Sequence, residues 1–340
     1  MAGLVTVGQL DGQDVRRVTL SGERGLQAEI LTNGARLAAL WVPDRDGKLA
    51  DIVLGFDTLT DWQGRGGYLG ATCGRYSNRI ADGRFSLDGR TVQVDRNEGQ
   101  QHLHGGRSGL DTKHWTIVDH SDSHVTLETS SPDGEMGYPG VMTARVTYRV
   151  EGLGLTIELE ARTDAPTVVN LVNHAYFNLA GHASGDVLGQ HLQIDAGYYL
   201  PVDDRLIPTG EVRLVSGTPF DFRTVRPIGA EMPGPGGFDH NFCLSSTTDE
   251  KGLRRCLRAE DPVSGRKMQL STTEPGVQIY TGAHFDGTPG KSGARYPKFA
   301  GFAAETQRFP NSPNTPHFPS ARLDPGQVYR HLMQFDFTPA

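Results

Sequence analysis

The feature that most constrains the fold of this chain is the alternation of apolar and polar residues at every second position. It is clearest where the apolar members are Val146, Tyr148, Val150, Leu155, Ile157, Leu159 and Ala161. The alternation breaks at Glu151-Gly152, which predicts a β-hairpin with one buried face. Two further hairpins are predicted, from segments 115–118 and 125–129 and from segments 84–87 and 91–94.

Helical periodicity is weak by comparison. No window of 12 or more residues repeats apolar residues with a 3.6 period, and only residues 56–62 and 225–232 are candidates for short helices. Glycine occurs 43 times in 340 residues, well above the usual roughly 7%, so many tight turns are expected. We therefore predict an all-β fold, a large antiparallel sandwich or barrel. Because no linker or repeat interrupts the chain, residues 1–340 are expected to form a single domain.

Charge and cysteine content restrict the partners. The net charge of -7 is dispersed, and no basic run could neutralise phosphates, so neither nucleic acid nor an anionic membrane is an expected partner. A neutral small molecule fits better. Three cysteines without CxxC spacing argue against a disulfide framework or structural zinc. The N-terminus lacks the features of a signal peptide and no stretch approaches the roughly 18 apolar residues of a membrane span, which predicts a cytoplasmic protein.

Two titratable residues could carry acid/base chemistry. Glu305 ends an apolar strand-like run, where partial desolvation would raise its pKa toward a value useful for a base. His174 lies between Asn173 and the aromatic pair Tyr176-Phe177, and imidazole titrates near neutrality. Each residue also has a plain interpretation, a glutamate facing water or an arginine and a hydrogen-bonded structural histidine. His174 gains interest only if it lies beside Glu305.

His102 and His104 are separated by one residue and would project to the same side of a strand, beside the permissive Gly105-Gly106. They could bind a hydroxylated ligand, join His174 in a metal site, or be ordinary turn residues. No acidic residue stands at a third-ligand spacing nearby, so no metal is expected.

Other segments contain side chains that can hydrogen-bond to hydroxyl groups. Asn78 and Arg79 end a stretch that also contains Arg75, and guanidinium forks donate well to paired oxygens. Asp239 is flanked by aromatic residues and could either accept sugar hydroxyls or cap a turn. Gln278 alternates with apolar neighbours, so it should point away from the core, toward solvent or ligand.

The identity and order of these segments resemble the galactose mutarotases, or aldose 1-epimerases. The segments that carry the resemblance are residues 74–85, 102–106, 173–181, 238–242, 275–281 and 305–307. They extend from about residue 70 to 320 in the family's order, and the probability that all six agree by chance is very small.

The resemblance implies a large β-sandwich, the galactose mutarotase-like supersandwich, whose concave face binds the sugar. It implies Glu305 as general base and His174 as general acid, with Tyr176 lining the pocket. The sugar-binding positions implied by the resemblance are Asn78, Arg79, His104, Asp239 and Gln278. One departure follows Gln307: the chain has Pro310-Asn311-Ser312-Pro313-Asn314 where the family often has an acidic Pro-Asp-Ala segment, so the rim of the site could select a different sugar.

The sequence thus predicts an enzyme that interconverts the α and β anomers of a free aldohexose, such as galactose or glucose, without a cofactor, as a monomer or homodimer. Three rivals remain. A hexose-6-phosphate epimerase would need a cationic pocket, for which Arg75, Arg79 and Arg295 are available. A non-catalytic carbohydrate-binding protein could use the same scaffold. A glycosidase could use Glu305 and Asp239 as a carboxylate pair.

Overall fold

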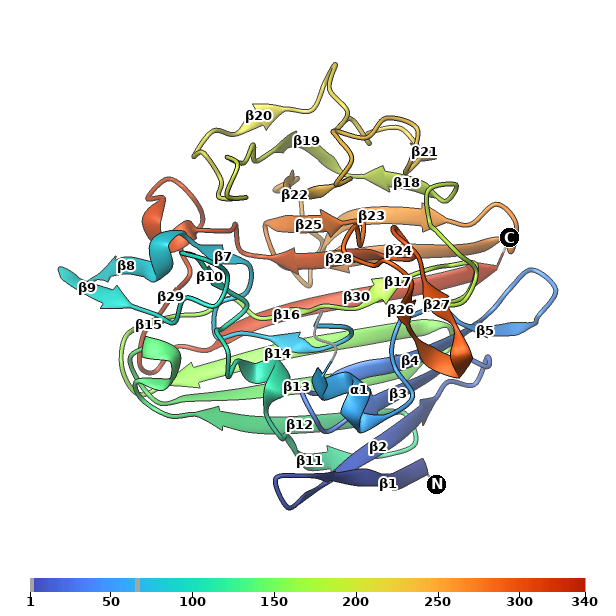
Figure 1. The fold of residues 1–340 in the computed structure, drawn as a ribbon, viewed down its shortest axis with the longest axis horizontal. Coiled ribbons are helices and arrows are strands. Elements are labelled where there is room, and N and C mark those ends of the chain that lie inside the picture. Colours follow the sequence, from blue (N-terminus) through green and yellow to red (C-terminus); the bar gives the residue numbers. More distant parts are fainter. Residues whose placement is uncertain (1–2, 65–67, 340) are drawn as a thin grey trace.

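The computed structural model describes residues 3–64 and 68–339, and its framework is three antiparallel sheets (Figure 1). The first sheet has the order β1 (Gly3–Leu10), β2 (Gln13–Ser21), β3 (Gln27–Leu31), β4 (Arg36–Pro43) and β5 (Leu49–Asp51). The second, of nine strands, has the order β11 (Thr116–His120), β12 (His124–Ser131), β13 (Met142–Glu151), β14 (Gly154–Thr163), β30 (Tyr329–Pro339), β24 (Arg266–Thr272), β23 (Arg254–Glu260), β18 (His191–Ile194) and β21 (Arg226–Pro227). The third has the order β17 (Tyr176–Phe177), β28 (Phe302–Gln307), β25 (Gly276–Tyr280), β22 (Asp239–Leu244), β19 (Ala196–Tyr199) and β20 (Arg213–Leu214). The predicted all-β antiparallel fold is confirmed.

Five two-stranded ladders complete the fold. They are β6 (Thr72–Cys73) with β16 (Val172–Asn173), β7 (Arg79–Ile80) with β10 (His102–Leu103), β8 (Arg84–Leu87) with β9 (Arg90–Gln93), β15 (Thr167–Val168) with β29 (Arg322–Leu323), and β26 (Thr288–Pro289) with β27 (Arg295–Tyr296). Short 3-10 turns lie at Ala81–Gly83, Leu110–Thr112, Glu135–Gly137, Lys291–Gly293 and Ser312–Asn314.

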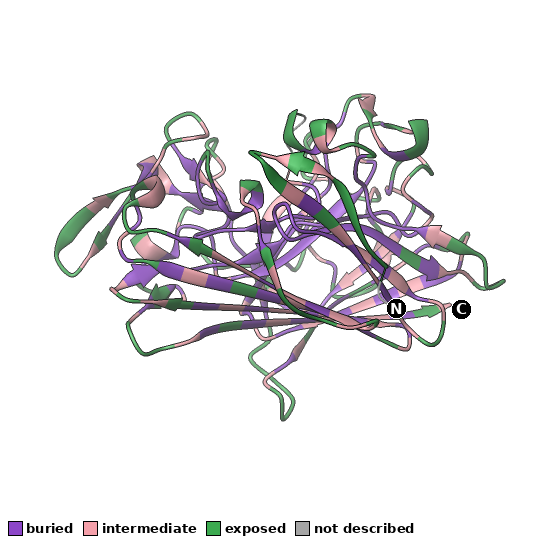
Figure 2. Cartoon of the chain, turned by 90° about the horizontal axis from the view of Figure 1, so that it is seen from below, coloured by how far each residue is buried: buried purple, intermediate pink, exposed green. Residues whose placement is uncertain are grey.

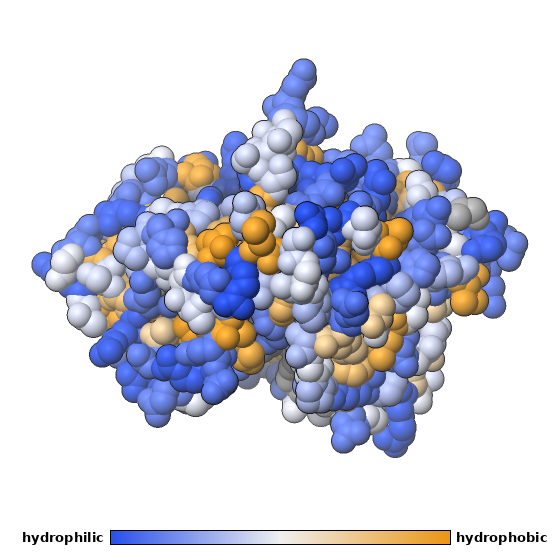
Figure 3. All heavy atoms as spheres, turned by 90° about the horizontal axis from the view of Figure 1, so that it is seen from above, coloured by the Kyte–Doolittle hydropathy of each residue, from blue (hydrophilic) through white to orange (hydrophobic). Residues whose placement is uncertain are grey.

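The three predicted hairpins are present as β13–β14, β11–β12 and β8–β9. In β13 every second residue from Met142 to Val150 is buried, as the alternation required. One hydrophobic core joins the nine-stranded sheet to the other two large sheets, because residues such as Ile157, Leu40 and Phe302 belong to the same buried cluster. In Figure 2 the buried residues lie between the layers and exposed residues lie at the outer strands and loops. Seen from above, the surface is mainly hydrophilic with small apolar groups (Figure 3).

The two helix predictions had different outcomes. Among the described residues the only α-helix is α1 (Leu59–Gly64), which overlaps the candidate at 56–62 and buries Trp62. The helix predicted at 225–232 is wrong. Arg226 and Pro227 instead form β21 at the edge of the nine-stranded sheet, where a proline's missing N–H costs no ladder hydrogen bond. Val225 is 60% exposed, so it supplies no buried helical face.

Two composition-based expectations can be compared with the described chain. The three cysteines are free thiols, and Cys73 and Cys256 are buried. Within residues 3–64 and 68–339, no helix has the length and apolar character needed to cross a membrane.

Candidate active site

The strand β28 presents Glu305 on the face of its sheet that lies away from the main core. Phe302 and Ala304 point into that core, whereas Glu305 lies on the opposite side of the strand. Its register partner on β25 is Gln278, which therefore shares its face. Loops cover this face, so Glu305 is only 2% exposed. Strand geometry places Glu305 on the same face as Gln278, and the covering loops bury its carboxylate.

His174 lies in the short connection between β16 and β17, and its main chain is fixed on both sides. Its N–H donates to the carbonyl of Ala71 at 2.8 Å, and its carbonyl accepts the N–H of Gly70 at 2.9 Å. Strand β17 pairs with β28, Tyr176 opposite Ala303, which carries the histidine toward Glu305. The imidazole Nε2 lies 3.5 Å from Oε1 of Glu305. The structure therefore brings the two predicted acid/base residues together from positions 131 residues apart in the sequence.

Burial shifts both pKa values toward the neutral forms. Desolvation raises the pKa of Glu305 well above its ordinary value, with the charge of Asp239 adding to the effect and Arg79 opposing it. Desolvation lowers the pKa of His174 to about 4. Oε2 of Glu305 and Nδ1 of His174 are buried without a hydrogen-bond partner among the described residues. Burial therefore disfavours the charged form of both residues in the free pair.

His104 lies beside this pair, and His102 does not. The rings of His104 and His174 have centroids 5.1 Å apart, with Tyr68 against both rings at 4.6 and 5.9 Å. The expectation that His102 and His104 share a side is wrong, because β10 ends at Leu103 and His104 adopts a left-handed φ of 51°. His102 instead contacts the carbonyl of Asp95 at 2.7 Å and the hydroxyl of Tyr138 at 2.6 Å.

Arg79 and Asp239 form a polar part of the cavity wall, which connects to His104 through Asn78. Two bonds tie the Arg79 guanidinium to Glu98, from Nε at 2.6 Å and from Nη2 at 2.7 Å, and Nη1 lies 3.5 Å from Asp239. Asn78 accepts the N–H of Arg79 at 2.9 Å, and its own N–H donates to Nδ1 of His104 at 3.2 Å. The wall is thus a continuous network that holds the guanidinium in one orientation.

These groups enclose a cavity of about 430 Å³. The predicted site residues on its wall are Asn78, Arg79, His104, His174, Tyr176, Asp239 and Glu305. Gln278 points away from the core, as predicted, but lies behind the wall, where its Nε2 donates to Asp239 at 2.6 Å. The size is within the range typical of small-molecule sites.

Sequence reasoning missed several residues of this wall, chiefly Tyr68, Glu98, Tyr280 and His284. Tyr280 lies in segment 275–281, which carries part of the family resemblance. Its hydroxyl contacts Nδ1 of His284 at 2.8 Å. Glu98 lies four residues before His102, close in the sequence to a segment that carries the family resemblance. Nothing in the local sequence distinguishes Tyr68 from an ordinary turn residue.

The expectation that segment 310–314 forms the rim of the site is wrong in the described structure, and the phosphate-binding alternative gains no support. Segment 310–314 does not line the cavity, since Asn311 packs behind it and donates its N–H to the carbonyl of Arg79 at 2.9 Å. Arg75 donates to Ser131 and Pro132, and Arg295 donates to the carbonyl of Gly287. Neither residue lines the cavity. Arg79 is the arginine on the wall, and two carboxylates already face it, which disfavours a phosphate pocket.

The donor atoms of His104, His174 and Glu305 lie within 4.8 Å of one another, close enough to share a metal ion. The surrounding hydrogen bonds fit proton transfer better. A metal-bound histidine usually donates its second ring N–H to an acceptor. Here the N–H of Asn78 points at Nδ1 of His104, and Nδ1 of His174 has no partner among the described residues.

Comparison with known proteins gives a consistent result. A family model described as aldose 1-epimerase matches residues 16–336. Galactose mutarotase from Bos taurus is 44% identical over 318 residues, covering 93% of this chain and 92% of the relative. Aldose 1-epimerase from Escherichia coli (strain K12) is 37% identical over 338 residues, covering 96% of each chain.

Solved structures extend the likeness to the fold. An aldose epimerase homologue from C. elegans superposes with a TM-score of 0.90 at 32% identity, covering 96% of this chain and 99% of the other. Galactose 1-epimerase from Lactobacillus acidophilus superposes with a TM-score of 0.86 at 26% identity, covering 99% and 98%. Fold and site together define a β-sandwich isomerase of the sugar-converting class. The chain belongs to the aldose 1-epimerase family.

Proposed function

We propose that this protein is a mutarotase, which interconverts the α and β anomers of a free aldohexose such as galactose or glucose. The observation that carries the proposal is the buried pair of Glu305 and His174, 3.5 Å apart on the wall of a cavity suited to a small polar ligand. Such a pair can accept one proton and supply another across a bound pyranose.

The chemistry needs a base at the anomeric hydroxyl and an acid at the ring oxygen. A carboxylate on Glu305 removes the hydroxyl proton while an imidazolium on His174 protonates the ring oxygen, and the ring carbon–oxygen bond breaks to give the open-chain aldehyde. The aldehyde end rotates, and the reverse transfers close the ring on its other face. Protons balance, because each residue ends the cycle as it began.

The neutral forms of the two residues together hold the same number of protons as this reactive pair. Burial favours the carboxylic acid and neutral imidazole, whereas the reaction uses the carboxylate and imidazolium, which differ by the transfer of one proton between the two residues. Hydroxyls of a bound sugar and the charge of Arg79 stabilise the ionic form, since Arg79 lowers the pKa of Glu305.

The remaining wall residues hold the sugar in this reading. Arg79, Asn78 and Asp239 hold hydroxyls, His104 donates toward developing negative charge, and Tyr176 packs beside His174 with centroids 5.0 Å apart. Gln278 lies behind the cavity wall and acts as a positioning residue for Asp239.

Polarimetry on freshly dissolved α-galactose or α-glucose tests the proposal. Glu305→Gln should lower the catalysed rate of optical rotation change by about 10² to 10⁴, because one positioned proton transfer is lost. The control is Glu158→Gln, which changes a half-buried residue of β14 that does not line the cavity. This variant should retain the wild-type rate. A Glu305→Gln protein that keeps the full rate would exclude Glu305 as the base. Sugar binding without any anomerisation by the wild type would instead support a binding protein.

A further inference from the structure

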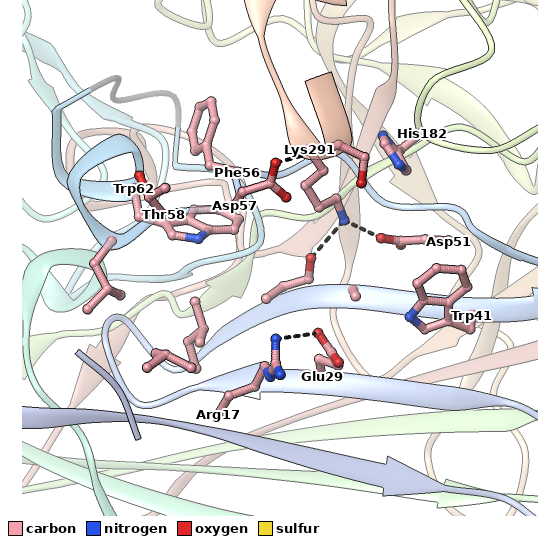
Figure 4. Close-up of a pocket in the computed structure, with 16 residues that line it drawn as sticks. Arg17, Glu29, Trp41, Asp51, Phe56, Asp57, Thr58, Trp62, His182 and Lys291 are labelled. Atoms are coloured by element: carbon pink, nitrogen blue, oxygen red, sulfur yellow. Dashed lines mark hydrogen bonds and ion pairs between the residues drawn. The ribbon is translucent and has the colours of Figure 1, made fainter. Parts of the chain in front are cut away.

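A second cavity, separate from the active site, lies between the first sheet and the 3-10 turn at Lys291–Gly293 (Figure 4). Its volume is about 450 Å³, close to the roughly 430 Å³ of the active-site cavity, and the two share no lining residue. Both fall in the range of small-molecule sites. A ligand of the same size class as the proposed substrate therefore fits here.

The polar part of this cavity contains two ion pairs, each formed by one basic and one acidic side chain. Lys291 is 8% exposed, and its Nζ donates to Asp51 and to the carbonyl of Ala38 at 2.9 Å. An ammonium has three N–H donors, and these are its two acceptors among the described residues. Nη1 of Arg17 on β2 lies 3.6 Å from Oε2 of Glu29 on the neighbouring strand β3.

The charges on the wall nearly cancel. Arg17 and Lys291 are cations, and Glu29, Asp51 and Asp57 are carboxylates. Each cation already faces a carboxylate, which disfavours an anionic ligand, and the third carboxylate, Asp57, accepts the backbone N–H of Ser292 at 2.7 Å. Paired donors and acceptors of this kind suit a neutral ligand that carries several hydroxyl groups.

The apolar part is aromatic. Trp41, Phe56 and Trp62 line the cavity, and Figure 4 shows the Lys291–Asp51 pair between Trp62 and Trp41. Trp41 is 38% exposed, which leaves part of its ring available to a ligand. Aromatic rings flanking a polar floor give a sugar both the apolar surface for its C–H face and partners for its hydroxyls.

We propose that this cavity is a second binding site, for a neutral monosaccharide, apart from the catalytic site. The two sites are connected through packing, since Phe56 and Trp62 belong to the same buried hydrophobic cluster as Tyr176 on the active-site wall. The proposal does not depend on the anomerisation reaction, because it concerns binding at other residues.

The distribution of tryptophan provides a local probe. The chain has three tryptophans; Trp41 and Trp62 line this cavity, Trp115 is fully buried in the core, and none of the three lines the described active-site cavity. Protein labelled with 5-fluorotryptophan should therefore give three fluorine resonances, assigned with Trp41→Phe and Trp62→Phe.

The titrants are methyl β-D-galactopyranoside and methyl β-D-glucopyranoside, which have no free anomeric hydroxyl and cannot be anomerised. We expect saturable shifts of the Trp41 and Trp62 resonances with at least one of them, and none at Trp115. In Trp41→Ala the half-saturating concentration read from Trp62 should rise at least tenfold. Tyr198→Ala, which removes another exposed aromatic ring, should leave the titration unchanged.

Two outcomes overturn the proposal. The first is that no resonance moves at 100 mM glycoside, or that inorganic phosphate moves them as well as the sugars do. The second is that the shifts disappear in Arg79→Ala, which weakens the catalytic site, since the tryptophans would then be reporting that site. Shifts that persist in Arg79→Ala support an independent site, whatever the polarimetry shows.

Discussion

The two cavities each contain a buried acid–base pair, and the pairs are held in opposite ways. Asp51 accepts backbone N–H groups from Leu40 at 3.0 Å and Val53 at 3.2 Å as well as the ammonium of Lys291. Glu305 and His174 lie 3.5 Å apart, and each has a buried polar atom with no partner among the described residues. In the first pair the protein supplies hydrogen-bond partners to both charged groups, whereas in the second pair one polar atom of each residue is left for a ligand.

The difference shows that a buried acid–base pair can either stabilise the fold or transfer protons. A buried ion pair that also hydrogen-bonds to the surrounding protein ties chain segments together, and losing one partner leaves an uncompensated charge. A buried pair without such bonds moves toward its neutral forms, and its proton can be transferred at small cost. Solvent exposure alone would not distinguish the two pairs, because Asp51, Lys291, Glu305 and His174 are all buried.

The sharpest test of this comparison removes one member of each pair. Lys291→Met leaves Asp51 buried and unpaired, and we expect a loss of about 3–5 kcal/mol in the free energy of unfolding. Glu305→Gln removes a carboxyl that lacks a full set of partners, and we expect a change below about 1 kcal/mol. Urea unfolding followed by circular dichroism measures both. Equal losses in the two variants would break the comparison.

The pH dependence of the rate tests whether the catalytic pair shares one proton. Below the pKa of His174, about 4, the imidazole takes up a second proton while Glu305 is still protonated, so no base remains. The catalysed rate should fall about tenfold per pH unit below about 4. It should also fall at alkaline pH, above the raised pKa of Glu305, where the pair has lost its proton.

Polarimetry between pH 3.5 and 9, corrected for the uncatalysed rate and accompanied by circular dichroism to confirm folding, gives this profile. An acidic limb near 6.5, the ordinary pKa of histidine, would contradict the effect of burial on His174.

The smallest expected effect concerns Glu98, which touches Arg79 with both carboxylate oxygens. Glu98→Gln keeps the shape but weakens this charged contact, so Arg79 is held less firmly for binding. We expect KM to rise about tenfold or less with kcat nearly unchanged, since Glu98 is a positioning residue. Initial rates by polarimetry at several sugar concentrations separate the two constants. A fall in kcat at constant KM would show that Glu98 acts in the chemical step.

Much of the fold followed from local patterns because strand alternation and turn residues are local properties. The β13–β14 hairpin and the orientation of Gln278 away from the core were both predictable for this reason. The helix predicted at 225–232 failed because pairing with β18 outweighed a weak local preference. His102 and His104 separated because a single left-handed residue redirects the chain, which alternation cannot predict.

The sequence by itself determined the main hairpins and the segments that resemble the family, since these depend on residue order over short distances. Tertiary structure decided that His174 meets Glu305, that Glu98 and Tyr68 complete the wall, and that Gln278 stands behind Asp239. The physical reason is that a pKa and a hydrogen-bond partner depend on which distant segments exclude water from a group. In this chain the loops that cover β28 supply that exclusion.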